Sequence, residues 1–102
     1  QQQMTKTKEE AIDQVEDNSD ALWLGAARTV LEQLARTRTF ITSDDVWDRV
    51  EPPREPRAMG AVLRWGMRQG LIEVTDRIKP SRRRECHGRR IQVWRSRKFR
   101  AA

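Results

Sequence analysis

A stretch of helical periodicity constrains the fold of this chain more than any other feature. From Leu22 to Leu34, apolar residues recur at three- and four-residue steps, which is the pattern of one face of an amphipathic helix. Asn18-Ser19-Asp20 precedes this stretch and supplies the side chains of a helix cap. We therefore expect a helix that begins at about Ser19, with Asn18 or Ser19 as its cap, and ends near Arg36.

Two shorter elements follow this helix. Thr39-Phe40-Ile41 is β-branched and aromatic, which suits a short extended segment. Thr42-Ser43-Asp44-Asp45 then offers hydroxyl and carboxylate groups to the start of a helix. The pattern predicts a short second helix, which carries the apolar residues Val46, Trp47 and Val50.

A third helix and two strands complete the predicted order. Pro52 and Pro53 end the second helix, and Pro56 suits the first turn of the next one. We expect this third helix from about Glu55 to Gln69, with Gly70 as its C-terminal stop. Leu71–Thr75 and Arg90–Trp94 have the composition of strands, and an arginine-rich link from about Asp76 to Arg89 joins them.

This order of elements resembles the winged helix-turn-helix family over residues 19–97. The resemblance rests on the segment from Phe40 to Trp47, which opens the second helix, and on Gly70-Leu71-Ile72, which closes the third. The stretch from Pro80 to Arg89 is similar to the wing of small winged-helix proteins encoded by actinobacterial phages and prophages. The resemblance implies an α+β, mainly α fold, in which a three-helix core carries a small antiparallel β-hairpin, the wing. It also implies DNA binding, with the third helix in the major groove and the wing on the backbone, although some members of the family bind only protein.

The length of 102 residues fits one compact domain, which we expect over residues 19–97. Residues 1–18 form a polar, acidic segment, in which we interpret Gln1-Gln2-Gln3 as an added leader before Met4. This segment is either a solvated tail or part of a contact with a second copy or a protein partner through Ile12, Val15 and Leu22. Residues 98–102 are predicted to be a basic, disordered tail.

The two halves of the chain carry opposite net charge. Residues 1–53 contain six Lys/Arg and eleven Asp/Glu, whereas residues 54–102 contain fifteen Lys/Arg and four Asp/Glu. This asymmetry predicts an anionic partner for the second half, and nucleic acid is the leading one because neutralising phosphates releases counterions. A membrane is disfavoured, since the sequence has neither a basic amphipathic helix with a broad apolar face nor an apolar run of membrane-spanning length.

The predicted third helix has two chemically different sides. At about 100° per residue, one side carries the residues that we expect in the core, Met59, Val62, Leu63 and Gly66. The opposite side carries Arg57, Ala61, Arg64 and Arg68, with Arg54 nearby. Arginine can grip a guanine edge or a phosphate with its planar fork, and the small residues Gly60 and Ala61 keep the helix slim. We predict that this ridge contacts DNA; the alternative is a solvated charged face.

A second basic cluster surrounds the predicted loop, where only Asp76 and Glu85 are acidic. A cationic hairpin beside a groove-reading helix can follow phosphates or reach into the minor groove. We therefore predict backbone contacts here, although a solvated loop is the alternative. The predicted contacts are Lys79, Arg82, Arg83, Arg84, Arg89 and Arg90, with Arg77 nearby and Arg95, Arg97, Lys98 and Arg100 continuing the basic surface.

The other residues that could carry chemistry have structural interpretations. Cys86-His87 is the only metal-like pair, and a structural zinc site needs about four ligands, so we predict no metal and assign the pair to the wing. A site shared across a dimer is left open. The carboxylates Asp44, Asp45 and Asp48 could hold Mg²⁺, but their place at a helix start favours capping.

The four tryptophans could stack on single-stranded bases, yet most of them fit a core. Trp23 and Trp47 fall in apolar stripes, Trp65 lies at the border of the core face, and Trp94 is expected to be partly exposed. No phosphate-cradling glycine-rich loop and no catalytic triad is evident in the sequence.

The sequence thus predicts a non-enzymatic double-stranded DNA-binding protein, a phage-type regulator of transcription or replication, with no cofactor and no small-molecule substrate. A single domain of this type reads a short site, so a homodimer or a protein partner is expected where specificity is high. The single cysteine and the polar N-terminus suit the bacterial cytoplasm. Two alternatives stay open: an adaptor whose arginine face docks an acidic protein, and a binder of RNA or single strands.

Overall fold

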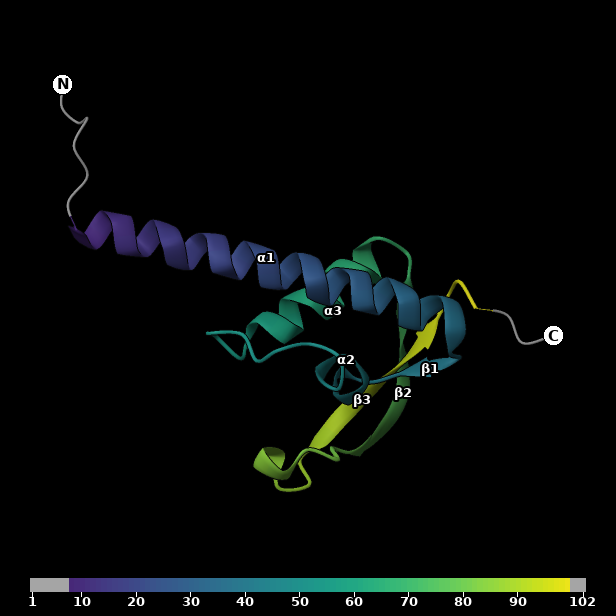
Figure 1. The fold of residues 1–102 in the computed structure, drawn as a ribbon. Helices are drawn as coiled ribbons and strands as arrows, with labels where there is room; N and C mark the ends of the chain where they lie inside the picture. Colours follow the sequence, from purple (N-terminus) through teal and green to yellow (C-terminus); the bar gives the residue numbers. More distant parts are fainter. Residues whose placement is uncertain (1–7, 100–102) are drawn as a thin grey trace.

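A computed structural model of the protein describes residues 8–99, with side chains from Asp20 onward. The expected leader Gln1-Gln2-Gln3 and the tail beyond Phe99 lie outside the described residues. The described part is a small α+β domain with three helices and one three-stranded antiparallel sheet (Figure 1). Its elements are α1 (Lys8–Thr37), β1 (Phe40–Ile41), α2 (Ser43–Trp47), α3 (Ala58–Arg68), β2 (Ile72–Pro80) and β3 (Arg90–Ser96).

The helix α1 is longer than expected. It begins at Lys8 rather than at Ser19, so the cap signal of residues 18–20 does not start a helix. The reason is local, because no Gly or Pro lies between Lys8 and Asp20 and because Glu, Ala and Gln favour helix. The backbone hydrogen bonds of the helix therefore continue through residues 18–20 without interruption. Its 30 residues span about 45 Å, and its first part projects away from the body (Figure 1).

The helix α2 begins with the predicted cap. The backbone N–H of Thr42 donates to the Asp45 carboxylate at 2.8 Å, and Asp44 and Asp45 lie in the first turn, where negative charge is favourable. The helix α3 begins at Ala58, later than the expected Glu55. Its entry is a tight turn in which Ala58 N–H donates to Glu55 O at 3.0 Å.

The end of α3 agrees with prediction. Gly70 has a φ of +74°, a left-handed value that a glycine adopts without the steric cost of a Cβ atom. The N–H of Leu71 donates to Gly66 O at 2.9 Å, which closes the last turn.

The sheet has the strand order β1-β3-β2. Ile41 pairs with Trp94 and Ile72 with Ser96, so the two-residue β1 lies on one side of β3 and β2 on the other. Both hairpin strands extend farther than expected, and the connecting loop shrinks to residues 81–89. Between Val74 and Ile78 the register shifts, and Thr75 Oγ1 donates to Val93 O at 2.6 Å there, which ties the irregular part of β2 to β3.

The core lies where α1 and α3 cross over one face of the sheet. The four residues expected on the core side of α3 are all buried, which confirms that face. Gly66 lies at the crossing, because a Cβ atom there would stand 2.5 Å from Leu31 Cδ2. Further fully buried residues are Ala27, Leu31, Leu34, Ala35, Ile41 and Val46.

The tryptophans line the edge of this core rather than its centre. Trp23 and Trp47, expected inside, are half-buried, and their ring centroids lie 6.1 Å apart. Trp65 is half-buried beneath the Arg28 guanidinium, whose carbon lies 4.9 Å from the ring centroid. Trp94 is half-buried, in agreement with its expected partial exposure.

Candidate nucleic-acid interface

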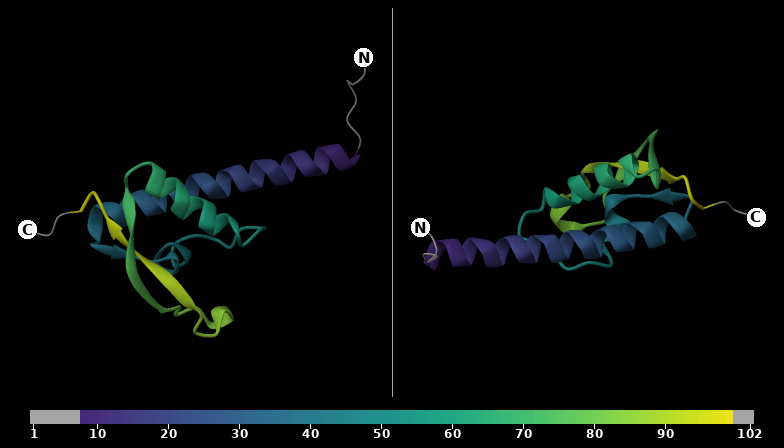
Figure 2. Two further views of the ribbon diagram at one scale, coloured as in Figure 1. Left: turned by 180° about the vertical axis from the view of Figure 1, so that it is seen from behind. Right: turned by 90° about the horizontal axis from the view of Figure 1, so that it is seen from above.

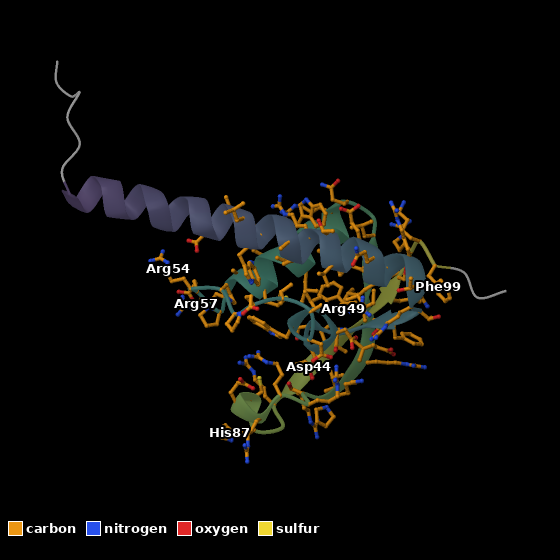
Figure 3. All side chains as sticks on the ribbon, viewed as in Figure 1. Asp44, Arg49, Arg54, Arg57, His87 and Phe99 are labelled. Atoms are coloured by element: carbon orange, nitrogen blue, oxygen red, sulfur yellow. The ribbon has the colours of Figure 1, made fainter. Side chains whose placement is uncertain are left out.

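The predicted arginine ridge lies on the surface of α3. Arg57, Arg64 and Arg68 are exposed, and Ala61 is half-buried between them. The Arg57 side chain is 93% exposed, and its contact with Glu55 at 4.0 Å is at the limit of an ion pair. Arg54 lies on the link before α3 (Figure 3), where it pairs with Asp20 on α1 at 3.4 Å.

A groove separates the first half of α3 from the hairpin loop. Its volume is about 520 Å³, and Met59, Gly60 and Leu63 of α3 form part of its lining. Figure 2 shows α3 and the hairpin on the side of the molecule turned away from α1. Trp47 and Trp94 contribute aromatic surface, and four arginines line the groove: Arg57, Arg83, Arg89 and Arg90. The structure thus brings one cation of the predicted ridge, Arg57, to the same concave surface as the loop arginines, whereas Arg64 and Arg68 do not line this groove.

The hairpin loop is folded by its own backbone hydrogen bonds. Ser81 N–H donates to Arg89 O at 2.8 Å, and Arg89 N–H donates to Cys86 O at 2.8 Å, so both ends of the loop are closed. Residues 84–86 form a 3₁₀ turn, and His87 follows in the left-handed region with a φ of 49°. This turn leaves Arg84, Arg89 and Arg90 exposed. Cys86-His87 is therefore part of the turn of the hairpin loop.

The base of this loop is fastened to α2 by Asp44. The side chain is almost completely buried, and its carboxylate accepts a hydrogen bond from Ser81 Oγ at 2.7 Å and one from Arg82 N–H at 2.5 Å. Figure 3 shows Asp44 between α2 and the hairpin. Sequence reasoning assigned this residue to helix capping, and it missed the contact because its partners lie almost forty positions away.

Arg82 is engaged by the same acidic helix. Its Nη2 atom lies 3.1 Å from carboxylate oxygens of both Asp45 and Asp48. The hydrogen bond and the charge of Asp48 raise the pKa of the Arg82 guanidinium above its ordinary value. Among the predicted phosphate contacts, Arg82 is thus directed toward α2.

Arg83 has an aromatic partner. Its guanidinium carbon lies 4.2 Å from the centroid of the Trp47 ring, and Nη2 is 3.4 Å from a Glu85 carboxylate oxygen. Such stacking fixes the plane of the guanidinium group, and the group keeps its positive charge. Arg83 therefore lines the groove in a fixed orientation.

Arg77, Arg95 and Arg97 lie on the opposite face of the sheet and at its edge, and Lys79 lines a hollow with Arg77 and Phe40 rather than the groove. Arg95 and Arg97 pair with Glu73, and the Arg77 guanidinium stacks on Phe40 with its carbon 4.7 Å from the ring centroid. Arg95 and Arg97 were expected to continue the basic surface. The structure instead gives them an acidic partner on β2.

Within residues 8–99, no group of three or more His, Cys, Asp or Glu side chains is arranged to hold a metal ion. No helix of this described range is long and apolar enough to cross a membrane. Comparisons of the chain with protein-family models, curated proteins and solved structures give no match.

Proposed function

We propose that this protein is a winged helix-turn-helix domain that binds double-stranded DNA and catalyses no reaction. The observation that carries the proposal is the groove between the start of α3 and the hairpin, which is lined by Arg57, the residue just before α3, and by Arg83, Arg89 and Arg90 of the hairpin. In this interpretation α3 enters the major groove, the hairpin loop contacts the backbone, and the protein acts as a phage-type regulator of transcription or replication.

The dimensions of α3 suit this role. Its 11 residues are about 16 Å long, and a B-DNA major groove is about 12 Å wide and admits one helix. Arg57, Arg64 and Arg68 project from the side opposite the core, where Gly60 and Ala61 add little bulk. Arginine at such positions can bond a guanine edge with two parallel N–H groups or neutralise a phosphate.

The hairpin residues divide into two roles under this proposal. The exposed cations contact phosphates, and they are Lys79, Arg84, Arg89 and Arg90. Arg82 and Arg83 hold the loop against α2 through Asp48 and Trp47, which keeps the exposed cations in one place relative to α3. A preorganised loop binds more tightly than a mobile one because less conformational entropy is lost on binding.

Equilibrium binding of a random-sequence duplex to charge-matched double variants tests the proposal. Arg64→Ala with Arg68→Ala removes two cations from the α3 ridge, whereas Arg95→Ala with Arg97→Ala removes two exposed cations that pair with Glu73 outside the groove. We expect the ridge variant to lose affinity by about tenfold or more and the control variant by less than about threefold. Equal losses in the two variants would contradict the proposal.

Two competitions separate the other interpretations. Single-stranded DNA or RNA that displaces the duplex at equal nucleotide concentration would favour a binder of single strands. A stoichiometric acidic protein retained from a nuclease-treated lysate, together with no duplex affinity, would favour the adaptor.

A further inference from the structure

An apolar hollow lies where α1 leaves the body of the domain. Its volume is about 360 Å³, and α1 and the link between α2 and α3 both contribute to its lining. Trp23 forms a fixed wall, since its Nε1–H donates to Glu51 O at 2.5 Å. Leu22 stands at the edge of the hollow and is 77% exposed, the largest exposed fraction among the bulky apolar residues of the described chain. The lining is completed by the apolar residues Ala26, Val50, Pro52 and Pro53 and, at the charged side of the hollow, by Asp20, Glu51 and Arg54.

An apolar row leads from this hollow along the projecting part of α1. In the sequence, Ile12, Val15, Leu22 and Ala26 are separated by three, seven and four residues, which are the steps of one helical stripe. The sequence therefore places an apolar stripe on the same helix that contributes Leu22 and Ala26 to the hollow. A surface that contains both a ridge and its complementary hollow can pair with a second copy of itself about a twofold axis.

Packing against a second copy would stabilise the projecting half of α1. Most helical stability in proteins comes from burying an apolar face against another element. Figures 1 and 2 show that the rest of the domain does not extend along the first part of α1.

We propose that the exposed face of α1 is a homodimer interface, in which a second copy of the chain packs its α1 antiparallel to the first with the twofold axis near Leu22. The charge pattern selects this orientation. Residues 8–20 contain one Lys and six Asp/Glu, so a parallel pair would place two acidic segments side by side. The antiparallel pair places each acidic segment beside the second half of the partner's α1, which carries the exposed Arg36.

The oligomeric state of the full chain tests this interface. We expect sedimentation equilibrium to give the mass of a dimer for the wild type and the mass of a monomer for Leu22→Asp. Ala21→Asp is the matched control, because it adds the same charge to an exposed position about 100° around the helix and is expected to stay dimeric. Thermal melting by circular dichroism verifies that both variants stay folded. A monomeric wild type, or a dimeric Leu22→Asp, would overturn the proposal.

Disulfide trapping tests the orientation. In a Cys86→Ser background, we mix one variant that carries Val15→Cys with another that carries Thr29→Cys and then oxidise the mixture. Positions 15 and 29 are equally far from Leu22, so the antiparallel dimer is expected to give the mixed disulfide in excess. Self-disulfides of the Val15→Cys variant in excess would show a parallel pair and refute this arrangement. None of these readouts involves DNA, so failure of the dimer and failure of the proposed function are distinguishable.

Discussion

The buried carboxylate of Asp44 accepts a hydrogen bond from the Ser81 hydroxyl at 2.7 Å, and this contact joins the first turn of α2 to the base of the hairpin loop. The same Ser81 oxygen accepts a hydrogen bond from Arg83 N–H at 3.1 Å. The position of the loop relative to α3 therefore depends on a residue of the acidic half of the chain, which contributes no cation to the candidate interface.

Replacing Asp44 is expected to destabilise the domain. Asp44→Ala leaves the Ser81 hydroxyl and the Arg82 N–H without their acceptor in a buried place, and each such loss costs about 1–3 kcal/mol. We expect the free energy of unfolding in urea to fall by about 2–4 kcal/mol. Asp48→Ala, at an exposed position, is the control and should lower it by less than about 1 kcal/mol. Similar losses for the two variants would contradict the role of Asp44.

Replacing Arg82 is expected to change the stability of the fold, whereas replacing Arg84 is expected to change duplex binding. Arg82→Ala should lower the denaturation midpoint, because it removes the partner of Asp45 and Asp48. Folding raises the pKa of Arg82, so the contribution of this residue to the free energy of unfolding is fully present below the ordinary arginine pKa. This contribution should be constant from pH 6 to about pH 10. Arg84→Ala should leave the midpoint unchanged and weaken duplex binding. Urea melts and fluorescence anisotropy measure the two quantities, and the reverse pattern would exclude this division of roles.

Two glycines in helices are expected to respond to alanine in opposite directions. The new Cβ atom in Gly66→Ala meets Leu31 Cδ2 at 2.5 Å in a packed core, and such overpacking costs about 1–3 kcal/mol, which exceeds the gain in helix propensity of about 1 kcal/mol. Gly25→Ala meets nothing within 4 Å on exposed α1 and should stabilise the protein by about 0.5–1 kcal/mol. Thermal denaturation gives both signs, and a stabilised Gly66→Ala would argue against the close crossing of α1 and α3.

Arg64 and Arg89 are expected to differ in what they recognise. An arginine on α3 can bond a base edge, whereas an arginine of the loop meets phosphates that are alike in every sequence. Selection from random duplexes at one fixed salt concentration should therefore give a changed motif for Arg64→Ala. For Arg89→Ala it should give the wild-type motif with weaker binding throughout. An unchanged motif for Arg64→Ala would show that Arg64 does not contact a base edge.

Local patterns in the sequence predict much of this fold. The stripe from Leu22 to Leu34, the cap at Thr42 and the stop at Gly70 each act within a few residues, so their effects can be read without a structure. The core side of α3 is predictable for the same reason, since helical periodicity fixes which residues share a face.

Contacts between distant segments are not predictable from such patterns. The partners of Asp44, the stacking of Arg83 on Trp47 and the pairing of Arg95 with Glu73 depend on how the hairpin lies against α2 and on strand register. Charge patterning locates basic segments, but it does not show which cations already have an internal partner.

The salt dependence of duplex binding by the full chain tests the central proposal most directly. If about six cations of α3 and the hairpin each neutralise one phosphate, the logarithm of the association constant should fall linearly with the logarithm of salt concentration, with a slope of about −5. Duplex affinity that does not change between low and moderate salt, or that is undetectable at low salt, would contradict it.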